Sequence, residues 1–318
     1  MFLSARLTVL VIPLSVFHAA AVVASAEEQK SDNQETAPQF AASLLAGLLA
    51  SNSSMRSYDV TYTSEFMRLH PINGLKCRDR KCRLAYDEDE KRGVFVRWSL
   101  IDAIPETDTP RNHSDLSAFY FDDSEELFHL SALGRKRVKL GKTQNVALLV
   151  GAPRLLSMGL VAFPDTMKTI SDDDPIWANL TIPSRDMVAR AESSDIARVV
   201  RRKLNGDKPE NETIWLFSLE TLLPVKRSSF YYHTVTGKRY LKEVEDFQWT
   251  TCNGHYVPSR IRRETNQRAR VSDTDIRQFS DIHETHFRWL SVNETLPDEL
   301  LDWKAIRTVQ EIRDLLVD

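Results

Sequence analysis

Little in this sequence of 318 residues is typical of an enzyme. It has only 10 glycines, which does not favour a glycine-rich nucleotide-binding core, and it contains no G-x-S-x-G or H-E-x-x-H motif. The sequence Gly141-Lys142-Thr143 matches the end of a phosphate-binding loop. The first glycine of that motif would have to stand at position 136, which is occupied by Lys136. We therefore expect a non-catalytic protein without a cofactor. A hydrolase without a recognisable motif is the alternative.

An excess of positive charge is also missing. The formal net charge is −3, whereas a dedicated nucleic-acid binder usually shows a strongly basic face. Basic residues do gather locally in "GRKRVKLGK", "RVVRRK", "RIRRE" and "RARV". If these segments were neighbours, they would form a cationic face for an anionic partner such as lipid headgroups. The other interpretation is an ordinary solvated face on which bases alternate with acids.

The one long apolar run lies at the N-terminus, "LTVLVIPLSVFHAAAVVASA". Arg6 precedes it and Ala24-Ser25-Ala26 ends it with the small-x-small pattern of a signal-peptidase site, so we predict a signal peptide over residues 1–26. An uncleaved membrane anchor is the alternative, although Pro13 and His18 interrupt the run. The expected product is exported, periplasmic or extracellular, and soluble after cleavage, with no stable membrane span.

Cysteine is scarce as well, with Cys77, Cys82 and Cys252 only. The turn signal Asn73-Gly74 just before the first two predicts that both lie on one extended strand. Five residues of strand span about 16 Å, while a disulfide tolerates a Cα separation of about 7 Å. The two side chains would also point to opposite faces. A hairpin at "RDRK", or a bond from either cysteine to Cys252, stays open.

Alternation of apolar and polar residues dominates the rest of the chain. It predicts strands in "SYDVTYTSEF", "GVFVRWSL", "DLSAFYF", "ELFHLSA", "DIARVVRRKL", "TIWLFSL", "LPVKRSSFYYH", "KRYLKEVEDFQW", "YVPSRIRRE" and "DIRQFSDIHETHFRWL", several of them separated by glycine turns. In "RYLKEVEDFQW" the apolar set changes parity, which indicates a bulge or a sheet covered on both faces in places. The predicted core is lined by Tyr58, Val60, Tyr62, Val94, Val96, Trp98, Trp215 and Phe217.

Helices are expected at three places. The first spans about 39–50, an apolar helical insertion with a long loop spans about 145–186, and "PDELLDW" and "TVQEIRDLL" close the chain. Residues 27–36 are polar and predict a disordered linker, which leaves one domain over 37–318. The predicted fold class is α+β, mainly antiparallel β: an incomplete, half-open β-barrel meander covered by helices.

Two further patterns resemble metal-binding sites but lack features that such sites need. "HETH" supplies His283 and His286, but on a strand the two imidazoles point to opposite faces and cannot share a metal. The acidic run Asp172-Asp173-Asp174 lacks the glycine turn and the terminal glutamate of a calcium loop. No metal is therefore expected.

Three short motifs between Trp215 and Leu300 carry a family resemblance. They are an acidic residue followed by Leu-Pro, from Glu220 to Pro224; a V-x-D-F strand core, from Val244 to Phe247; and an N-G-x-x-x-P return, from Asn253 to Pro258. Together with the front helix and "YDVTY", they resemble the outer-membrane lipoprotein carrier superfamily (LolA/LolB/RseB-like). The resemblance implies a half-open barrel with an apolar cavity for a lipid, an acyl chain or a lipoprotein. The chain is longer than the carriers and has a large middle insertion.

The resemblance implies a set of ligand-binding residues that line the cavity or form its lid. It comprises Leu44, Leu48, Trp98, Leu149, Leu156, Met158, Leu160, Phe163, Trp215 and Phe217. The segment 146–163 and the front helix would cap the cavity, or would simply pack as structural helices. An envelope interaction or sensory domain with a protein partner and no lipid cargo is the alternative function.

Overall fold

The computed structural model describes residues 55–72, 74–102, 115–122, 126–131, 134–139, 187–206, 208–270, 276–306 and 308–316. The predicted signal peptide, linker, front helix and middle insertion lie outside these residues, as does the aspartate run at 172–174. The single-domain boundary at 37 and the cleavage site at Ala26 therefore stay predictions.

The described part is a single sheet of 13 strands. The strands are β1 (Ser57–His70), β2 (Gly74–Asp87), β3 (Arg92–Asp102), β4 (Asp115–Phe121), β5 (Glu126–Ser131), β6 (Gly134–Lys139), β7 (Met187–Ala191), β8 (Ile196–Asn205), β9 (Lys208–Ser218), β10 (Pro224–Tyr232), β11 (Arg239–Cys252), β12 (His255–Arg270) and β13 (Ile276–Val292). Every pair of neighbouring strands is antiparallel, as the alternating sequence predicted.

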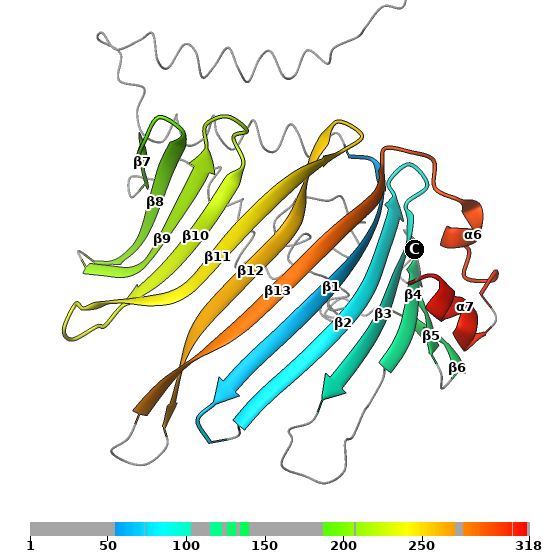
Figure 1. The fold of residues 1–318 in the computed structure, drawn as a ribbon, viewed down its shortest axis with the longest axis horizontal. Helices are drawn as coiled ribbons and strands as arrows, with labels where there is room; N and C mark the ends of the chain where they lie inside the picture. The colour runs from blue at the N-terminus through cyan, green and yellow to red at the C-terminus, as the bar shows by residue number, and fades with distance from the viewer. Residues whose placement is uncertain are drawn as a thin grey trace, which may run out of the picture.

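The strand order is β6-β5-β4-β3-β2-β1-β13-β12-β11-β10-β9-β8-β7. The first and last strands of the chain thus pair in the middle of the sheet, and Figure 1 shows β1 beside β13 with β6 and β7 at opposite ends. The sheet is open, because β6 and β7 are both edges. Residue pairs such as Tyr62 and Phe287 sit opposite each other although 225 positions separate them.

Local chemistry explains where the strands begin and end. Gly206, Gly237 and Gly254 adopt positive φ angles of 61°, 64° and 81° in the turns that their sequence predicted. The change of parity in β11 is a bulge, because the pairing of β10 with β11 shifts register between Ser229 and Phe230. Two strands, β6 and β7, were not among those predicted; β7 has only five residues and follows a segment expected to be loop.

The two cysteines near the first hairpin behave as their spacing predicted. Cys77 and Cys82 both lie on β2, so "RDRK" is strand and not a hairpin loop. An odd separation of five residues places them on opposite faces of the sheet. Both are free, and so is Cys252. The histidines of "HETH" also lie on a strand, β13, on opposite faces as expected. Within the described ranges no group of side chains could hold a metal ion.

The sheet has two different faces. The face that carries Tyr58, Val60 and Tyr62, with the residues in register with them on the other strands, is called the aromatic face below. The opposite face is called the helix face, because α6 (Asp298–Leu301) and α7 (Val309–Asp314) pack on it beside β2, β3 and β4 (Figure 1). Thr308 and Glu311 form a capping box that fixes the start of α7.

The helix face has its own core under these two helices. Buried side chains of β2–β5 pack there against leucines and isoleucines of the C-terminal segment: Ala85, Val94, Val96, Leu116, Ala118, Tyr120, Leu130, Leu296, Leu300, Leu301, Ile306, Ile312 and Leu316. Val94 and Val96 are therefore buried as predicted, but on the face opposite Tyr58 and Val60. Both faces of the first strands are therefore covered by apolar side chains.

Two expectations need correction. Trp98 was predicted to line the core, yet 39% of it is exposed, because it lies beyond the reach of α6 and α7 on the helix face. The predicted cover of helices reduces, within the residues described, to α6 and α7 with four and six residues. The alternation of residues predicts which face of a strand is buried. It does not show how far along the strand other elements cover that face.

Candidate functional site

The aromatic face is divided into an apolar half and a charged half. The apolar half is formed by side chains of β1–β5, β8, β9 and β11–β13 that follow the period of two in each strand. Its buried members include Tyr58, Val60, Tyr62, Cys82, Leu84, Tyr86, Phe95, Phe119, Phe121, Leu127, Ala197, Val199, Trp215, Phe217, Phe247, Val257, Ile261, Phe287 and Val292. Each is at most 8% exposed, so this half is well packed.

Ring contacts run across the apolar half from strand to strand. Tyr58 contacts Tyr86 with ring centroids 6.0 Å apart, and Tyr86 stacks on Phe121 at 6.2 Å. On the other side of β1, Tyr62 meets Phe287 at 5.6 Å. Such distances are typical of aromatic pairs that stabilise a core beyond their buried area. The result is a continuous apolar layer of aromatic side chains.

Trp215 extends this layer toward the far edge. Its ring lies 6.3 Å from those of Phe217 and Phe247, and it is only 2% exposed. Two other indoles in the cluster are fixed by hydrogen bonds to proline carbonyls of the neighbouring strand: Trp249 Nε1 to Pro224 at 2.7 Å, and Trp289 Nε1 to Pro258 at 2.8 Å.

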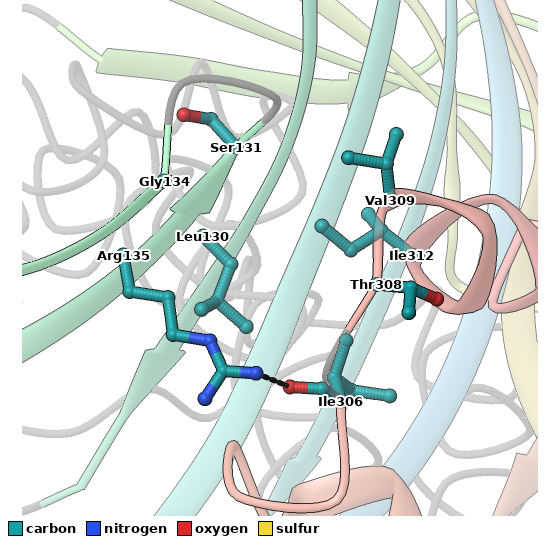
Figure 2. Close-up of a pocket in the computed structure, with 8 residues that line it drawn as sticks. All are labelled: Leu130, Ser131, Gly134, Arg135, Ile306, Thr308, Val309 and Ile312. Carbon is teal, nitrogen blue, oxygen red and sulfur yellow. Dashed lines mark hydrogen bonds between the residues drawn. The ribbon is translucent and has the colours of Figure 1, made fainter.

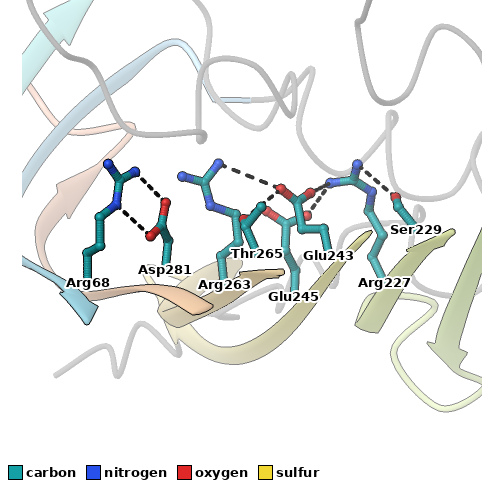
Figure 3. A network of polar contacts seen from close by, with 8 residues as sticks. All are labelled: Arg68, Arg227, Ser229, Glu243, Glu245, Arg263, Thr265 and Asp281. Atoms are coloured by element: carbon teal, nitrogen blue, oxygen red, sulfur yellow. Dashed lines mark hydrogen bonds and ion pairs between the residues drawn. The ribbon is translucent and has the colours of Figure 1, made fainter. Parts of the chain in front are cut away.

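The charged half of the same face lies beyond the aromatic residues along each strand. Arg227 on β10 forms ion pairs with Glu243 and Glu245 of β11, the first at 3.0 Å (Figure 3). Arg263 of β12 lies 3.9 Å from Glu243, and Thr265 donates to the same carboxylate at 3.2 Å. These carboxylates are buried, Glu245 at 1% and Glu243 at 9% exposure, so they need such partners.

A second ion pair continues this row toward β1. Arg68 donates from Nε to Asp281 Oδ1 at 2.6 Å, and from Nη2 to the other oxygen (Figure 3). Asp281 is 5% exposed, and its hydrogen bond raises the pKa of Arg68. Charges of both signs are thus matched across β10–β13 and β1.

On β2 and β3 the charged half is different. There the aromatic face carries Arg78, Arg80 and Arg97, close to Tyr62 and Cys82. Burial and the proximity of Arg78 and Arg97 lower the pKa of Arg80. Burial raises the pKa of the Cys82 thiol to about 11, and it also raises the pKa of Tyr62.

The predicted site residues fall into three groups by their place in the structure. Trp215 and Phe217 are brought together on the aromatic face, while Trp98 lies apart on the helix face. Leu44, Leu48, Leu149, Leu156, Met158, Leu160 and Phe163 are outside the described residues, and their role stays a prediction. The charged half was missed, although the alternate acids of "KEVED" opposite "VKRSS" in a hairpin signal a paired network.

Among the hollows of the described part of the chain, two lie on the helix face. One, of about 230 Å³, lies between β5, β6 and the C-terminal segment, where Arg135 donates to the carbonyl of Ile306 at 2.8 Å (Figure 2). This is smaller than the roughly 300–1,000 Å³ of typical ligand pockets. The other, of about 420 Å³, is lined by Asp246, Gln248, Arg260 and Arg262, and Arg260 is paired there with Glu284 at 2.7 Å. The first hollow is lined in part by apolar side chains, among them Leu130, Ile306 and Ile312, whereas the second is lined by polar and charged side chains.

The basic segments of the sequence do not form one cationic face. They lie on β6, β8 and β12, which are separated in the sheet order. Arg202 of β8 pairs with Glu212 at 2.6 Å, and Arg262 of β12 lies 3.9 Å from Glu284. The interpretation as solvated faces with alternating acids is the better one.

Comparisons with known proteins address the fold. No protein-family model and no curated protein matches the chain. Among the solved structures that match is a LolA superfamily protein from Nitrosomonas europaea, with 10% identity and a TM-score of 0.36; the match covers 82% of this chain and 99% of that one. Another is a DUF1329 family protein from Desulfovibrio piger, with 10% identity and a TM-score of 0.38; the match covers 86% of this chain and 100% of that one. A putative outer membrane lipoprotein-sorting protein domain from Vibrio parahaemolyticus also matches, with 9% identity and a TM-score of 0.36; the match covers 83% of this chain and 97% of that one.

Two of these solved structures, the LolA superfamily protein and the lipoprotein-sorting domain, carry the names of the superfamily that the sequence motifs resemble. At such identities and TM-scores the likeness says nothing of a ligand. In the part of the chain that the structure describes, no helix has the length and apolarity needed to cross a membrane. Within the described residues, the chain forms one open antiparallel sheet of 13 strands.

Proposed function

We propose that this protein is an exported, non-catalytic binding protein that holds a lipid, or the acyl chain of a lipidated partner, against the apolar half of the aromatic face. One observation carries the proposal: a continuous aromatic and aliphatic layer spans ten strands of an open sheet, and both described helices pack on the other face. An acyl chain gains about 0.8 kcal/mol for each methylene group that it buries on such a surface.

The charged half supports this assignment. Its ion pairs form a polar border to the apolar layer, and a border of that kind would define where an acyl chain ends. Arg227 marks the boundary, because its guanidinium lies 5.5 Å from the ring of Trp215 while it pairs with the glutamates. Ligand pockets commonly combine an apolar lining with a few placed polar groups.

The alternative is an envelope interaction or sensory domain without lipid cargo. The burial of the apolar half favours it, because residues such as Tyr58 and Phe217 at 0% exposure belong to a filled core. In that case protein partners would bind elsewhere on the surface. The capping role predicted for Leu44, Leu48 and the segment 146–163 applies only to the lipid-binding function.

Tryptophan fluorescence distinguishes the two functions and locates the ligand. Two single-tryptophan proteins retain either Trp289, on the aromatic face, or Trp303, which stacks on Phe128 of the helix face at 4.4 Å. The other tryptophans are replaced by phenylalanine. A brominated fatty acid should quench Trp289 saturably and leave Trp303 unchanged.

Quenching of Trp303 alone would place the lipid on the helix face and contradict the proposed site. If neither protein shows saturable quenching while circular dichroism shows a folded sheet, the result would favour the interaction-domain function over lipid binding. Native mass spectrometry of the purified protein provides an independent check, because a bound lipid adds its own mass.

A further inference from the structure

The far end of the β1–β2 hairpin exposes three large apolar side chains. Met67 is 48% exposed, Leu69 is 65% exposed and Ile72 is 58% exposed. These three residues are called the apolar tip below. Figure 1 shows this end of β1 and β2 at the lower end of the sheet, away from α6 and α7. Single exposed apolar residues are normal on a protein surface, whereas three within six positions of one hairpin indicate a surface that makes contact with a partner.

The apolar tip continues onto the neighbouring strands of the helix face. Beyond Tyr62, the side chains of β1 on this face, at positions 63, 65, 67 and 69, are all exposed. Met67 has Cys77 of β2 on one side and Ile282 of β13 on the other, and both are half-buried. The apolar tip is therefore the outermost part of a wider apolar area on the helix face.

The same end of the hairpin carries positive charge. Residues 67–78 contain Arg68, Lys76 and Arg78 and no acidic residue, which gives a formal charge of +3 in a chain whose total is −3. Asp281 offsets one of these charges through its ion pair with Arg68. Arg78 is exposed on the other face of the hairpin. An apolar surface bordered by positive charge is complementary to the surface of a membrane that contains anionic lipids.

Acidic residues begin only farther from the turn. Glu65 of β1 and Asp79 of β2 are directly opposite each other, and both are exposed on the helix face. Four residues of strand separate Glu65 from Leu69, which corresponds to about 13 Å. Amphipathic segments at a membrane surface bury their apolar side about 5–10 Å deep. The two carboxylates would therefore stay in water while the apolar tip is inserted.

We propose that the apolar tip docks this protein on the surface of a membrane that contains anionic lipids. Leu69 and Ile72 insert among the headgroups, and Arg78 lies at the level of the lipid phosphates. Insertion removes exposed apolar surface from water, and the basic residues add electrostatic attraction to the anionic lipids. The inference goes beyond the proposed function, because it concerns the exposed end of the hairpin and applies equally to a sensory domain without lipid cargo.

Sedimentation with vesicles tests the inference. The protein purified after export is mixed with sucrose-loaded vesicles of phosphatidylcholine alone, or of equal parts of phosphatidylcholine and phosphatidylglycerol. The bound fraction is measured against lipid concentration. The variant Leu69→Gln removes apolar surface from the tip, and the matched control is Val235→Gln, because Val235 is 85% exposed in the turn between β10 and β11. All variants have the same N-terminus, so any contribution of that end is equal.

The wild type should bind the mixed vesicles at least about fivefold more tightly than phosphatidylcholine vesicles. Leu69→Gln should weaken binding to the mixed vesicles about tenfold, because a leucine side chain no longer leaves water, while Val235→Gln binds as wild type. Arg78→Gln should reduce the preference for the mixed vesicles. Lys203→Gln, which removes a charge from a 70% exposed side chain on β8, should leave that preference unchanged. Melting curves verify that all variants are folded.

Four results would overturn the inference. Wild type that does not sediment with the mixed vesicles would refute docking, and equal affinity for the two kinds of vesicle would refute the role of anionic lipid. Equal losses in Leu69→Gln and Val235→Gln would show that the apolar tip is not the contact. A lipid-free dimer in analytical ultracentrifugation that Leu69→Gln dissociates would assign the tip to a second copy of the chain. Quenching of Trp289 by a brominated fatty acid is independent of all four, so the proposed function is tested separately.

Discussion

Arg83 of β2 and Asp59 of β1 face each other on the helix face in a two-point ion pair, with Nε–Oδ1 at 2.9 Å and Nη2–Oδ2 at 2.6 Å. The remaining guanidinium nitrogen donates to the carbonyl of Leu315 at 3.0 Å. One side chain therefore joins β1 and β2 to the end of the segment that carries α7. The pair is buried, with side-chain exposures of 16% and 6%.

Removal of Arg83 should be strongly destabilising. Arg83→Met leaves Asp59 buried without its cation and frees the C-terminal segment, which should lower the free energy of unfolding by about 3–5 kcal/mol. Urea denaturation measures the change. The control is Arg56→Met, because the Arg56–Asp89 pair is 66% and 58% exposed and should contribute less than about 1 kcal/mol. Equal effects of the two substitutions would contradict the structural role of Arg83.

Truncation of the two tryptophans that were predicted to share a core should lower the free energy of unfolding by different amounts. Trp215→Ala removes a side chain that is 2% exposed and should cost about 3–5 kcal/mol. Trp98→Ala removes one that is 39% exposed, and should cost less than half as much. Chemical denaturation of both variants makes the comparison. A larger loss for Trp98 would show that its face of β3 is more deeply covered than described.

Gly93 should not tolerate a larger residue. A Cβ atom there would lie 2.5 Å from the ring of Phe121 and 2.8 Å from the carbonyl oxygen of Ala85. Gly93→Ala should therefore reduce stability by about 1–3 kcal/mol through overpacking. In the double variant with Phe121→Leu the ring is absent, so the loss should be smaller than the sum of the two single losses. Additive losses in thermal melts would argue against this contact.

Stability should fall at alkaline pH in part because of Cys82. Its pKa rises from an ordinary value of 9.0 to about 11 in the folded protein, since the buried thiol resists ionisation. Above pH 9 the unfolded chain loses this proton while the folded chain keeps it, so stability declines as pH rises from about 9 to 11. The interval corresponds to about 2–3 kcal/mol.

Denaturation curves of wild type and Cys82→Val between pH 8 and about 11 isolate this contribution, because the tyrosines titrate in both proteins. Wild type should lose more stability than the variant over this range. Parallel pH profiles would show that the thiol ionises freely in the folded state.

Much of the local structure is determined by the sequence alone. Alternation in "SYDVTY" predicts β1, the glycine turns separate β8–β9, β10–β11 and β11–β12, and the end of the chain predicts α6 and α7. Even the opposite orientation of His283 and His286 follows from their separation of three positions on a strand. These features depend on backbone conformation and side-chain period within a few residues, which neighbouring residues specify.

Relations between strands were decided by the tertiary structure. The sequence placed Tyr58 and Val94 in one core, but the pairing of β2 with β1 and β3 puts them on opposite faces, because a period of two does not say which face of the sheet a strand presents. The same holds for Arg227 and Glu245, which become partners only through the register of β10 and β11. Long-range pairing also joins β1 to β13 and leaves Arg80 without an acid opposite it, since its cross-strand neighbours come from segments whose register no local pattern encodes.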